Sequence, residues 1–93
     1  MIVSFKDKET SKIWNREFSK KIPNQIQSIA YRKLVMIARS NSLEDLKIPP
    51  ANMLEKLYGN REGQYSIRIN NQWRICFEWK DSNAIEVEIV DYH

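Results

Sequence analysis

The chain is poor in the residues that form disulfides, metal sites and flexible loops: its 93 residues include one cysteine, one histidine and two glycines. A single cysteine, Cys76, cannot form an internal disulfide, which favours a reducing cytoplasm as its compartment. One histidine and scattered carboxylates give no recognisable metal-ligand spacing, so we expect no metal and no other cofactor. No apolar run approaches the roughly 20 residues of a membrane helix, and the first residues lack a signal-peptide pattern, so we expect no membrane association.

Length and composition predict a single globular domain over residues 1–93. Apolar residues make up 42% of the chain and charged residues 29%, which excludes a disordered protein. Positive charge is concentrated in residues 1–40, which hold nine Lys and Arg against three Asp and Glu. This distribution is compatible with a polyphosphate as a partner. Ordinary solvated helix faces would give the same pattern.

Hydrophobic spacing predicts two helices in the first half of the chain. The first covers residues 8–19, with Asp7 as its N-cap and Phe18 on its buried stripe. The second has Pro23 in its first turn and stops at Asn41. The other expected segments are a short strand at 2–5, a connector at 43–50 where two prolines exclude a helix, an ambiguous segment at 51–57 and a turn at 58–63.

From residue 64 onward, apolar and polar residues alternate, which predicts three strands joined by short polar loops. Three-residue loops at 71–73 and 81–83 would pair Ile69 with Ile75 and would keep the apolar side chains on one face. The same loops would pair Trp79 with Ile85. The predicted class is therefore α+β, with an N-terminal strand and two helices packed on an antiparallel sheet that ends in a three-stranded meander.

The predicted register gathers polar side chains at one end of the sheet. Asn70 would face Arg74, Arg74 would face Val90, and Arg68 and Tyr92 would lie on the same side. The chain then ends at its only histidine, the side chain most easily tuned for proton transfer near neutral pH. Two plainer explanations stay open: a solvated tail histidine, and polar residues on the wet face of a two-faced sheet.

Several motifs in the second half of the chain resemble those of a known family. The segments are PPANMLEKL at 49–57, GNREGQYSIRIN at 59–70, QWRICF at 72–77 and DYH at 91–93. Together they resemble the HigB toxins of the RelE superfamily of bacterial type II toxin–antitoxin modules, also called the plasmid-maintenance killer family. The resemblance implies a microbial-ribonuclease fold and an endoribonuclease, or mRNA interferase, that enters the ribosomal A site and cleaves mRNA there. It also implies neutralisation by a HigA-like helix-turn-helix antitoxin, with the complex repressing its own operon at operator DNA.

The resemblance further implies which residues act on RNA, because Arg74, Asp91, Tyr92 and His93 match family positions tied to cleavage. Cleavage without a metal requires deprotonation of a ribose 2′-hydroxyl, stabilisation of a pentacoordinate phosphorane and protonation of the leaving 5′-oxygen. Arg74 would hold the phosphate with its planar fork. His93 would transfer a proton, Asp91 would orient it, and Tyr92 would stack on or hydrogen-bond to a base or phosphate.

Two positions differ from the pattern of relatives. Glu55 stands where some relatives have a histidine, and it is a candidate general base. Tyr58 stands where many relatives have a lysine, and two explanations stay open: the basic contact is missing, or Lys56 supplies it. Arg68 and Asn70 are the further candidates for RNA binding.

Two other classes of protein stay open on the sequence. One is a non-catalytic module that binds RNA or the ribosome, and the other is a protein that acts mainly as antitoxin partner and co-repressor. A plainer explanation of Arg68 and Arg74 also stays open, in which they only pair with Glu78 or Glu88 across the sheet. Cys76 fits a small core filler better than a nucleophile, because no neighbouring base is evident.

Overall fold

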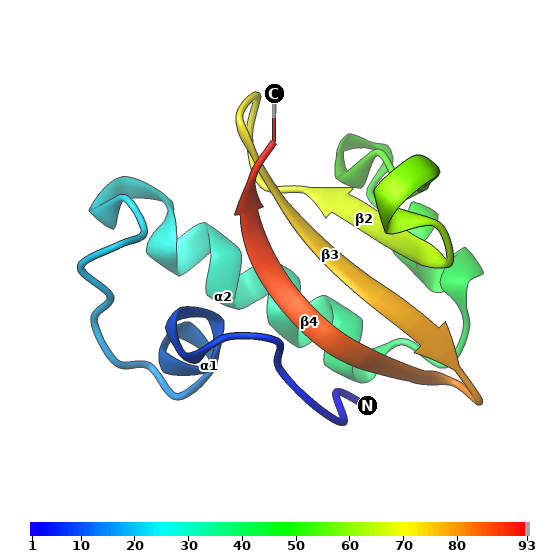
Figure 1. The fold of residues 1–93 in the computed structure, drawn as a ribbon, viewed down its shortest axis with the longest axis horizontal. Helices are drawn as coiled ribbons and strands as arrows, with labels where there is room; N and C mark the ends of the chain where they lie inside the picture. Colours follow the sequence, from blue (N-terminus) through cyan, green and yellow to red (C-terminus); the bar gives the residue numbers. More distant parts are fainter. Residues whose placement is uncertain (93) are drawn as a thin grey trace.

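The computed structural model describes residues 1–92, and His93 lies outside the described residues. Within them, helices and short 3-10 turns accompany a four-stranded antiparallel sheet of order β1-β2-β3-β4. The helices are α1, Lys8–Trp14, and α2, Asn24–Arg39; the strands are β1, Glu55–Lys56, β2, Gln64–Arg68, β3, Trp73–Lys80, and β4, Asn83–Asp91. Figure 1 shows α2 crossing behind the sheet with α1 beside it, which confirms the predicted α+β class. No helix in the described part of the chain has the length and apolar character to cross a membrane.

The core lies between α2 and the sheet. Helix α2 buries four side chains at a spacing of three and four residues, which places them on one face; these are Ile26, Ala30, Leu34 and Ile37. The sheet contributes the opposite half of this core, with Ile67, Ile75, Phe77, Val87 and Ile89. The predicted second helix is confirmed, except that Pro23 is the N-cap and lies just outside the first turn.

Helix α1 is shorter than predicted, because the chain leaves it through a Schellman motif. The Arg16 N–H donates to the Ile13 carbonyl at 3.0 Å, and the Glu17 N–H donates to the Lys12 carbonyl at 2.8 Å. Arg16 takes the left-handed position of this motif, with φ 63°, where glycine is the usual residue. The prediction that Phe18 lies on the buried stripe is therefore wrong, and its side chain is 63% exposed.

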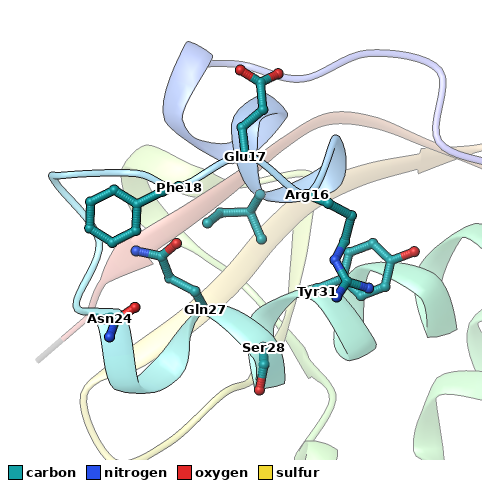
Figure 2. A pocket seen from close by; sticks show the side chains of 8 residues that line it. Arg16, Glu17, Phe18, Asn24, Gln27, Ser28 and Tyr31 are labelled. Carbon is teal, nitrogen blue, oxygen red and sulfur yellow. The ribbon is translucent and has the colours of Figure 1, made fainter.

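This motif and the start of α2 enclose a cleft of about 280 Å³. In Figure 2 the Arg16 guanidinium lies over Tyr31, with its Cζ 4.3 Å from the ring centroid. Phe18, Asn24 and Gln27 also line the cleft. None of the predicted site residues lines it, so this cleft is distinct from the predicted site.

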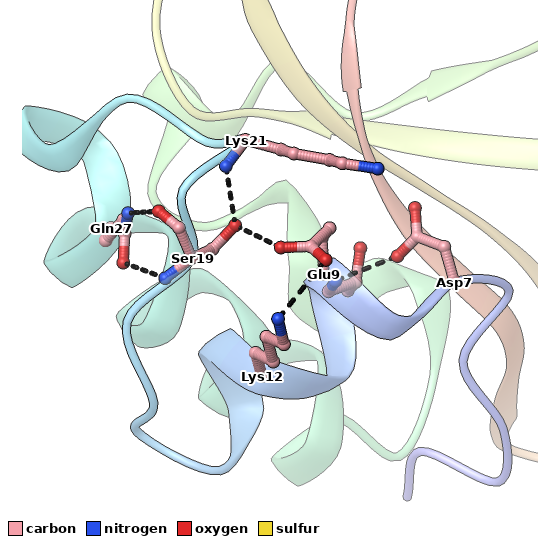
Figure 3. A network of polar contacts seen from close by, with 7 residues as sticks. Asp7, Glu9, Lys12, Ser19, Lys21 and Gln27 are labelled. Atoms are coloured by element: carbon pink, nitrogen blue, oxygen red, sulfur yellow. Dashed lines mark hydrogen bonds and ion pairs between the residues drawn. The ribbon is translucent and has the colours of Figure 1, made fainter.

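A polar network ties the connector between the two helices to both of them (Figure 3). Ser19 is fully buried; its Oγ donates to Glu9 Oε1 at 2.6 Å and accepts the Lys21 N–H at 3.2 Å. Gln27 Nε2 donates to the Ser19 carbonyl at 2.7 Å. The Ser19 hydroxyl is the main cause that lowers the pKa of Glu9 below its ordinary value. Asp7 caps α1 as predicted, since its Oδ1 accepts a first-turn N–H at 2.8 Å.

The pairing of β2 with β3 differs from the prediction by two residues. Arg68, not Asn70, faces Arg74, and the predicted Ile69–Ile75 pair is wrong by the same shift. The cause is a turn that begins at Asn70, whose Oδ1 accepts the backbone N–H groups two and three residues later, both at 2.8 Å. A shift of two residues leaves each side chain on its predicted face, so the apolar face stays intact.

The turn between β3 and β4 has two residues instead of the predicted three, with φ 53° and 65°. Trp79 consequently faces Ala84, and the predicted pair of Trp79 with Ile85 is wrong. A bulge at Glu86, where φ is 53°, adds one residue to β4 and restores the predicted register beyond it. Arg74 therefore faces Val90 as predicted.

The segments outside the main strands run close to the sheet edges. The predicted N-terminal strand is reduced to two parallel bridges along β4, Ile2 to Ala84 and Phe5 to Val87. The ambiguous segment at 51–57 contains β1, which lengthens the meander to four strands. Three 3-10 turns occupy the remaining connectors: η1, Leu43–Lys47, η2, Pro50–Asn52, and η3, Gly59–Arg61.

Candidate active site

Four of the predicted site residues, Arg68, Asn70, Arg74 and Tyr92, meet at a cleft of about 410 Å³ on the polar face of the sheet. Its lining consists of Met53, Arg68, Asn70, Asn71, Arg74 and Tyr92. Figure 1 shows why distant segments meet here, because the end of β4 and the β2–β3 turn lie side by side. The Tyr92 N–H donates to the Gln72 carbonyl at 2.6 Å and joins the two segments. The predicted clustering of Arg68, Asn70, Arg74 and Tyr92 is thus present.

Arg74 is the central side chain of this cleft, and it is only 8% exposed. Its Nε donates to Ser66 Oγ at 2.8 Å, and its Nη2 donates to the Met53 carbonyl at 2.6 Å. Burying a guanidinium costs free energy of folding unless its N–H groups are hydrogen-bonded. These contacts satisfy some of its N–H groups. The structure gives Nη1 no acceptor within residues 1–92. Among the described residues, the two N–H donors of Nη1 are thus the part of the guanidinium best suited to bind an anion.

Glu55 and Lys56 lie on β1, at the edge of the sheet next to β2. Glu55 is opposite Ser66, and its Oε1 is 3.9 Å from Arg74 Nη2, so this carboxylate reaches the side of the cleft. Lys56 is opposite Tyr65. Successive side chains of a strand point to opposite faces, so Lys56 points away from the face that carries Arg74. The structure brings Glu55 to Arg74 and does not bring Lys56 there.

Arg68 forms the outer wall of the cleft. Its Nη2 donates to Asn71 Oδ1, and its Nη1 lies 3.5 Å from Met53 Sδ. Asn70 also lines the cleft, but its side-chain oxygen is engaged by the backbone of the β2–β3 turn. Arg68 therefore contributes a positive charge at the opening, whereas Asn70 shapes the loop that carries the wall.

The C-terminal end of β4 completes the site. Asp91 faces Trp73 across the sheet, and its Oδ2 accepts Gln72 Nε2 at 3.1 Å. The Tyr92 ring is 38% exposed, and its centroid is 6.0 Å from the Arg74 Cζ. His93, the predicted proton-transfer residue, lies outside the described residues, so its role stays a prediction.

Farther along the polar face lies Glu88, one of the two carboxylates that the plainer explanation offered as partners for Arg68 and Arg74. Glu88 Oε1 accepts Arg61 Nη1 at 2.8 Å and lies 3.7 Å from Lys6 Nζ. Glu88 thus pairs with Arg61, and this leaves the cleft arginines to other partners. Burial raises the pKa of the neighbouring Cys76 thiol, which agrees with a packing role for this residue.

Two residues that line the cleft, Met53 and Asn71, were not singled out from the sequence, and neither was Ser66, which holds Arg74. Ser66 could have been found, because strand alternation places it on the same face as Arg68. Met53 gave no such signal, since its contribution depends on a left-handed backbone with φ 45° and ψ 56° at the end of η2. Sequence patterns do not predict that conformation for a methionine.

The fold and this cleft together define a class of protein: a small α+β domain whose antiparallel sheet carries a basic cleft at one end. Comparison with known proteins identifies the family. The family described as RelE-like toxin of type II toxin–antitoxin system HigB matches residues 3–93. The chain belongs to this family of HigB-like toxins, which confirms the resemblance and gives the fold its RelE-like type.

Individual relatives agree with this membership. The chain is 37% identical over 86 residues to Toxin HigB-1 of Vibrio cholerae serotype O1, covering 91% of this chain and 90% of the relative. It is 29% identical over 93 residues to Endoribonuclease HigB of Proteus vulgaris, covering 100% of both chains. It is also 38% identical over 73 residues to an uncharacterized protein of Haemophilus influenzae, covering 78% of this chain and 71% of the relative.

Proposed function

We propose that this toxin is an endoribonuclease that cleaves mRNA in the ribosomal A site by metal-independent acid–base chemistry. Membership in the HigB family and the similarity to Endoribonuclease HigB of Proteus vulgaris support ribonuclease activity. The observation that carries the proposal is the cleft itself, where the half-satisfied guanidinium of Arg74 lies beside Arg68, Glu55 and Tyr92. Cationic donors beside a carboxylate and an aromatic ring suit a phosphodiester and its flanking base.

In this proposal, Arg74 binds the scissile phosphate through its Nη1 donors. Because Nε and Nη2 are fixed by Ser66 and Met53, the guanidinium is held in one orientation before RNA arrives. Preorganised donors stabilise charge that develops in the transition state without reorganising during the reaction. Removing one such donor typically lowers the rate by about 10²–10³-fold.

The proton transfers are assigned to the acidic and C-terminal residues. A base removes the proton of the ribose 2′-hydroxyl, the 2′-oxygen attacks the adjacent phosphorus, and the bond from phosphorus to the 5′-oxygen breaks as that oxygen takes a proton. Glu55 is the proposed base, because its carboxylate is half exposed and near Arg74. His93 is the proposed acid, Asp91 its orienting partner and Tyr92 a stacking contact. Such transfers typically contribute about 10²–10⁴-fold each.

RNA contacts outside the reacting phosphate are proposed for Arg68, Asn70 and Lys56. Arg68 lies at the cleft and suits the neighbouring phosphate. Lys56, which points to the other face of β1, suits a more distant part of the mRNA or the ribosome. A basic residue that binds only backbone phosphate contributes affinity that decreases with salt.

Since the family is one of type II toxin–antitoxin systems, an antitoxin is the expected partner. We propose that it is a HigA-like helix-turn-helix protein, and that the complex of the two represses its own operon at operator DNA. The proposed site of action is the cytoplasm, where translating ribosomes and mRNA are found.

The test maps mRNA ends in a translating bacterial extract and, in parallel, on the same purified mRNA without ribosomes. We expect cuts only with ribosomes, their loss in Arg74→Ala and His93→Ala, and their retention in Arg39→Ala, a matched change of an exposed arginine on α2. Cuts in the purified mRNA would instead make the protein an independent nuclease.

Two outcomes would favour the other classes. A folded His93→Ala protein that still arrests translation, with no mRNA cuts from either protein, would make this a non-catalytic ribosome-binding module. If the wild-type chain neither cuts mRNA nor arrests growth but represses its operon together with the antitoxin, the co-repressor role would replace the enzyme.

A further inference from the structure

Asn52 is a polar side chain that is fully buried behind the candidate active site. Its Nδ2 donates to the Leu46 carbonyl at 3.1 Å and lies 3.8 Å from Met36 Sδ, while its Oδ1 accepts Lys33 Nζ at 2.5 Å. Buried amides are retained only where their hydrogen bonds are satisfied. These contacts fix the end of η2 against α2 and η1.

The residue after Asn52 adopts a backbone conformation that is rare for its type. Met53 is left-handed, with φ 45° and ψ 56°, and its N–H donates to the Pro50 carbonyl at 3.0 Å. A non-glycine residue keeps this conformation only where the surrounding structure enforces it. The conformation matters for the site, because it turns the Met53 carbonyl toward Arg74 Nη2 at 2.6 Å. It also leaves the Met53 sulfur beside Arg68.

Lys33 contacts the oxygen of the buried Asn52 amide, and this position is electrostatically unfavourable for its ammonium. A lysine on a helix surface normally extends its ammonium into water. Here the ammonium turns inward to Asn52, and partial burial, together with the charge of Arg32, lowers the pKa of Lys33. The Lys33 ammonium on α2 therefore supplies the hydrogen-bond donor that the buried Asn52 oxygen requires.

We infer that Lys33 and Asn52 are positioning residues, which fix the Met53 carbonyl and through it the orientation of the Arg74 guanidinium. The inference rests on the proposed function, because it assigns this orientation to phosphate binding. The chain of contacts runs from α2 through η2 to the cleft. Lys33 is hydrogen-bonded to Asn52, the peptide bond joins Asn52 to Met53, and the Met53 carbonyl accepts Arg74 Nη2. Neither residue touches the cleft itself.

The deciding variant is Lys33→Met, which keeps the aliphatic stem and removes the donor to Asn52. The full-length protein is labelled with ¹⁵N, and the Nε–H signal of Arg74, assigned with Arg74→Lys, is recorded. We expect this signal to shift or broaden in Lys33→Met while the Nε–H signal of Arg61, which is paired with Glu88, stays in place. Lys20→Met, a change of an exposed lysine in the helix connector, should move neither signal.

The second readout is single-turnover cleavage of ribosome-bound mRNA. A misplaced positioning contact can lower the rate by up to about 10²-fold. We expect Lys33→Met to reduce the maximal rate more than the apparent affinity, since Arg74 acts on developing charge. Lys33→Arg, which keeps a cationic donor, should recover part of the loss.

An unmoved Arg74 signal in folded Lys33→Met would overturn the inference. A Lys33→Met protein that fails to fold would also overturn it, because the pair would then maintain the fold itself. The two proposals fail separately: if Arg74→Ala still cleaves mRNA, the catalytic assignment is lost, whereas the NMR signal continues to report whether Lys33 orients the guanidinium.

Discussion

The hydrogen bond between Arg74 Nε and Ser66 Oγ is the contact whose removal should reveal most about the site. Both groups are buried, with Arg74 8% exposed and Ser66 0%, and they lie 2.8 Å apart on neighbouring strands. Ser66→Ala deletes the acceptor and leaves a charged N–H without its partner in a nearly dry position. Arg74→Met deletes the donor and keeps an unbranched apolar side chain that extends as far as the Nε position.

The magnitude follows from the burial of the pair. An unsatisfied buried donor costs about 1–3 kcal/mol, so Ser66→Ala should lower the free energy of unfolding by that amount. Arg74→Met removes the buried charge together with its requirement for partners, so its own effect should be smaller. A hydrogen bond to a charged group contributes about 1.5–3 kcal/mol, which is the coupling energy expected from the double-mutant cycle.

The assay is urea unfolding of the wild type, the two single variants and the double variant, followed by tryptophan fluorescence. The slope m, by which the free energy of unfolding decreases with urea concentration, should be equal among the four proteins. The reason is that the surface exposed on unfolding is nearly unchanged. Ser28→Ala, a change on the exposed face of α2, is the control and should stay within about 0.5 kcal/mol of the wild type. A coupling energy below about 0.5 kcal/mol would refute the reasoning, since it would mean that Ser66 does not hold the guanidinium.

Two further predictions concern stability. Because the Ser19 hydroxyl lowers the pKa of Glu9, the stabilisation from this carboxylate is fully present above its ordinary value of 4.5 and is lost as the pH decreases through the lowered pKa. Thermal unfolding below pH 4.5 should therefore depend less on pH in Ser19→Ala than in the wild type, and an identical pH dependence would contradict this. Leu34→Ala creates a cavity at a fully buried position of α2 and should lower the free energy of unfolding by about 2–5 kcal/mol in urea titrations, whereas a loss under about 1 kcal/mol would show that the core collapses around it.

The elements that the sequence predicted well are those fixed by local pattern. Helix α2 follows from apolar residues at a spacing of three and four, and the alternation after residue 64 predicts the strands and their faces. Because side-chain direction in a strand has a period of two, even the wrong β2–β3 register placed Arg68 and Arg74 on the correct face. The face that carries the candidate cleft could therefore be predicted before its geometry was known.

The elements that the sequence did not predict depend on contacts between distant residues. Helix α1 ends early because Arg16 adopts a left-handed conformation without glycine, and its side chain packs on Tyr31. The bulge at Glu86 is held by Ser4, whose Oγ accepts the Glu86 N–H at 3.0 Å from 82 positions away. Local patterns carry no information about such partners.

The amino-acid sequence by itself determined the α+β class, the membership in the HigB family and the face of the sheet that carries the arginines. Only the tertiary structure decided how Arg74 is held, through Ser66 on β2 and the left-handed Met53 after η2. The physical reason is that periodicity fixes the direction of a side chain, whereas the partners of a buried charge are fixed by packing between segments far apart in the chain.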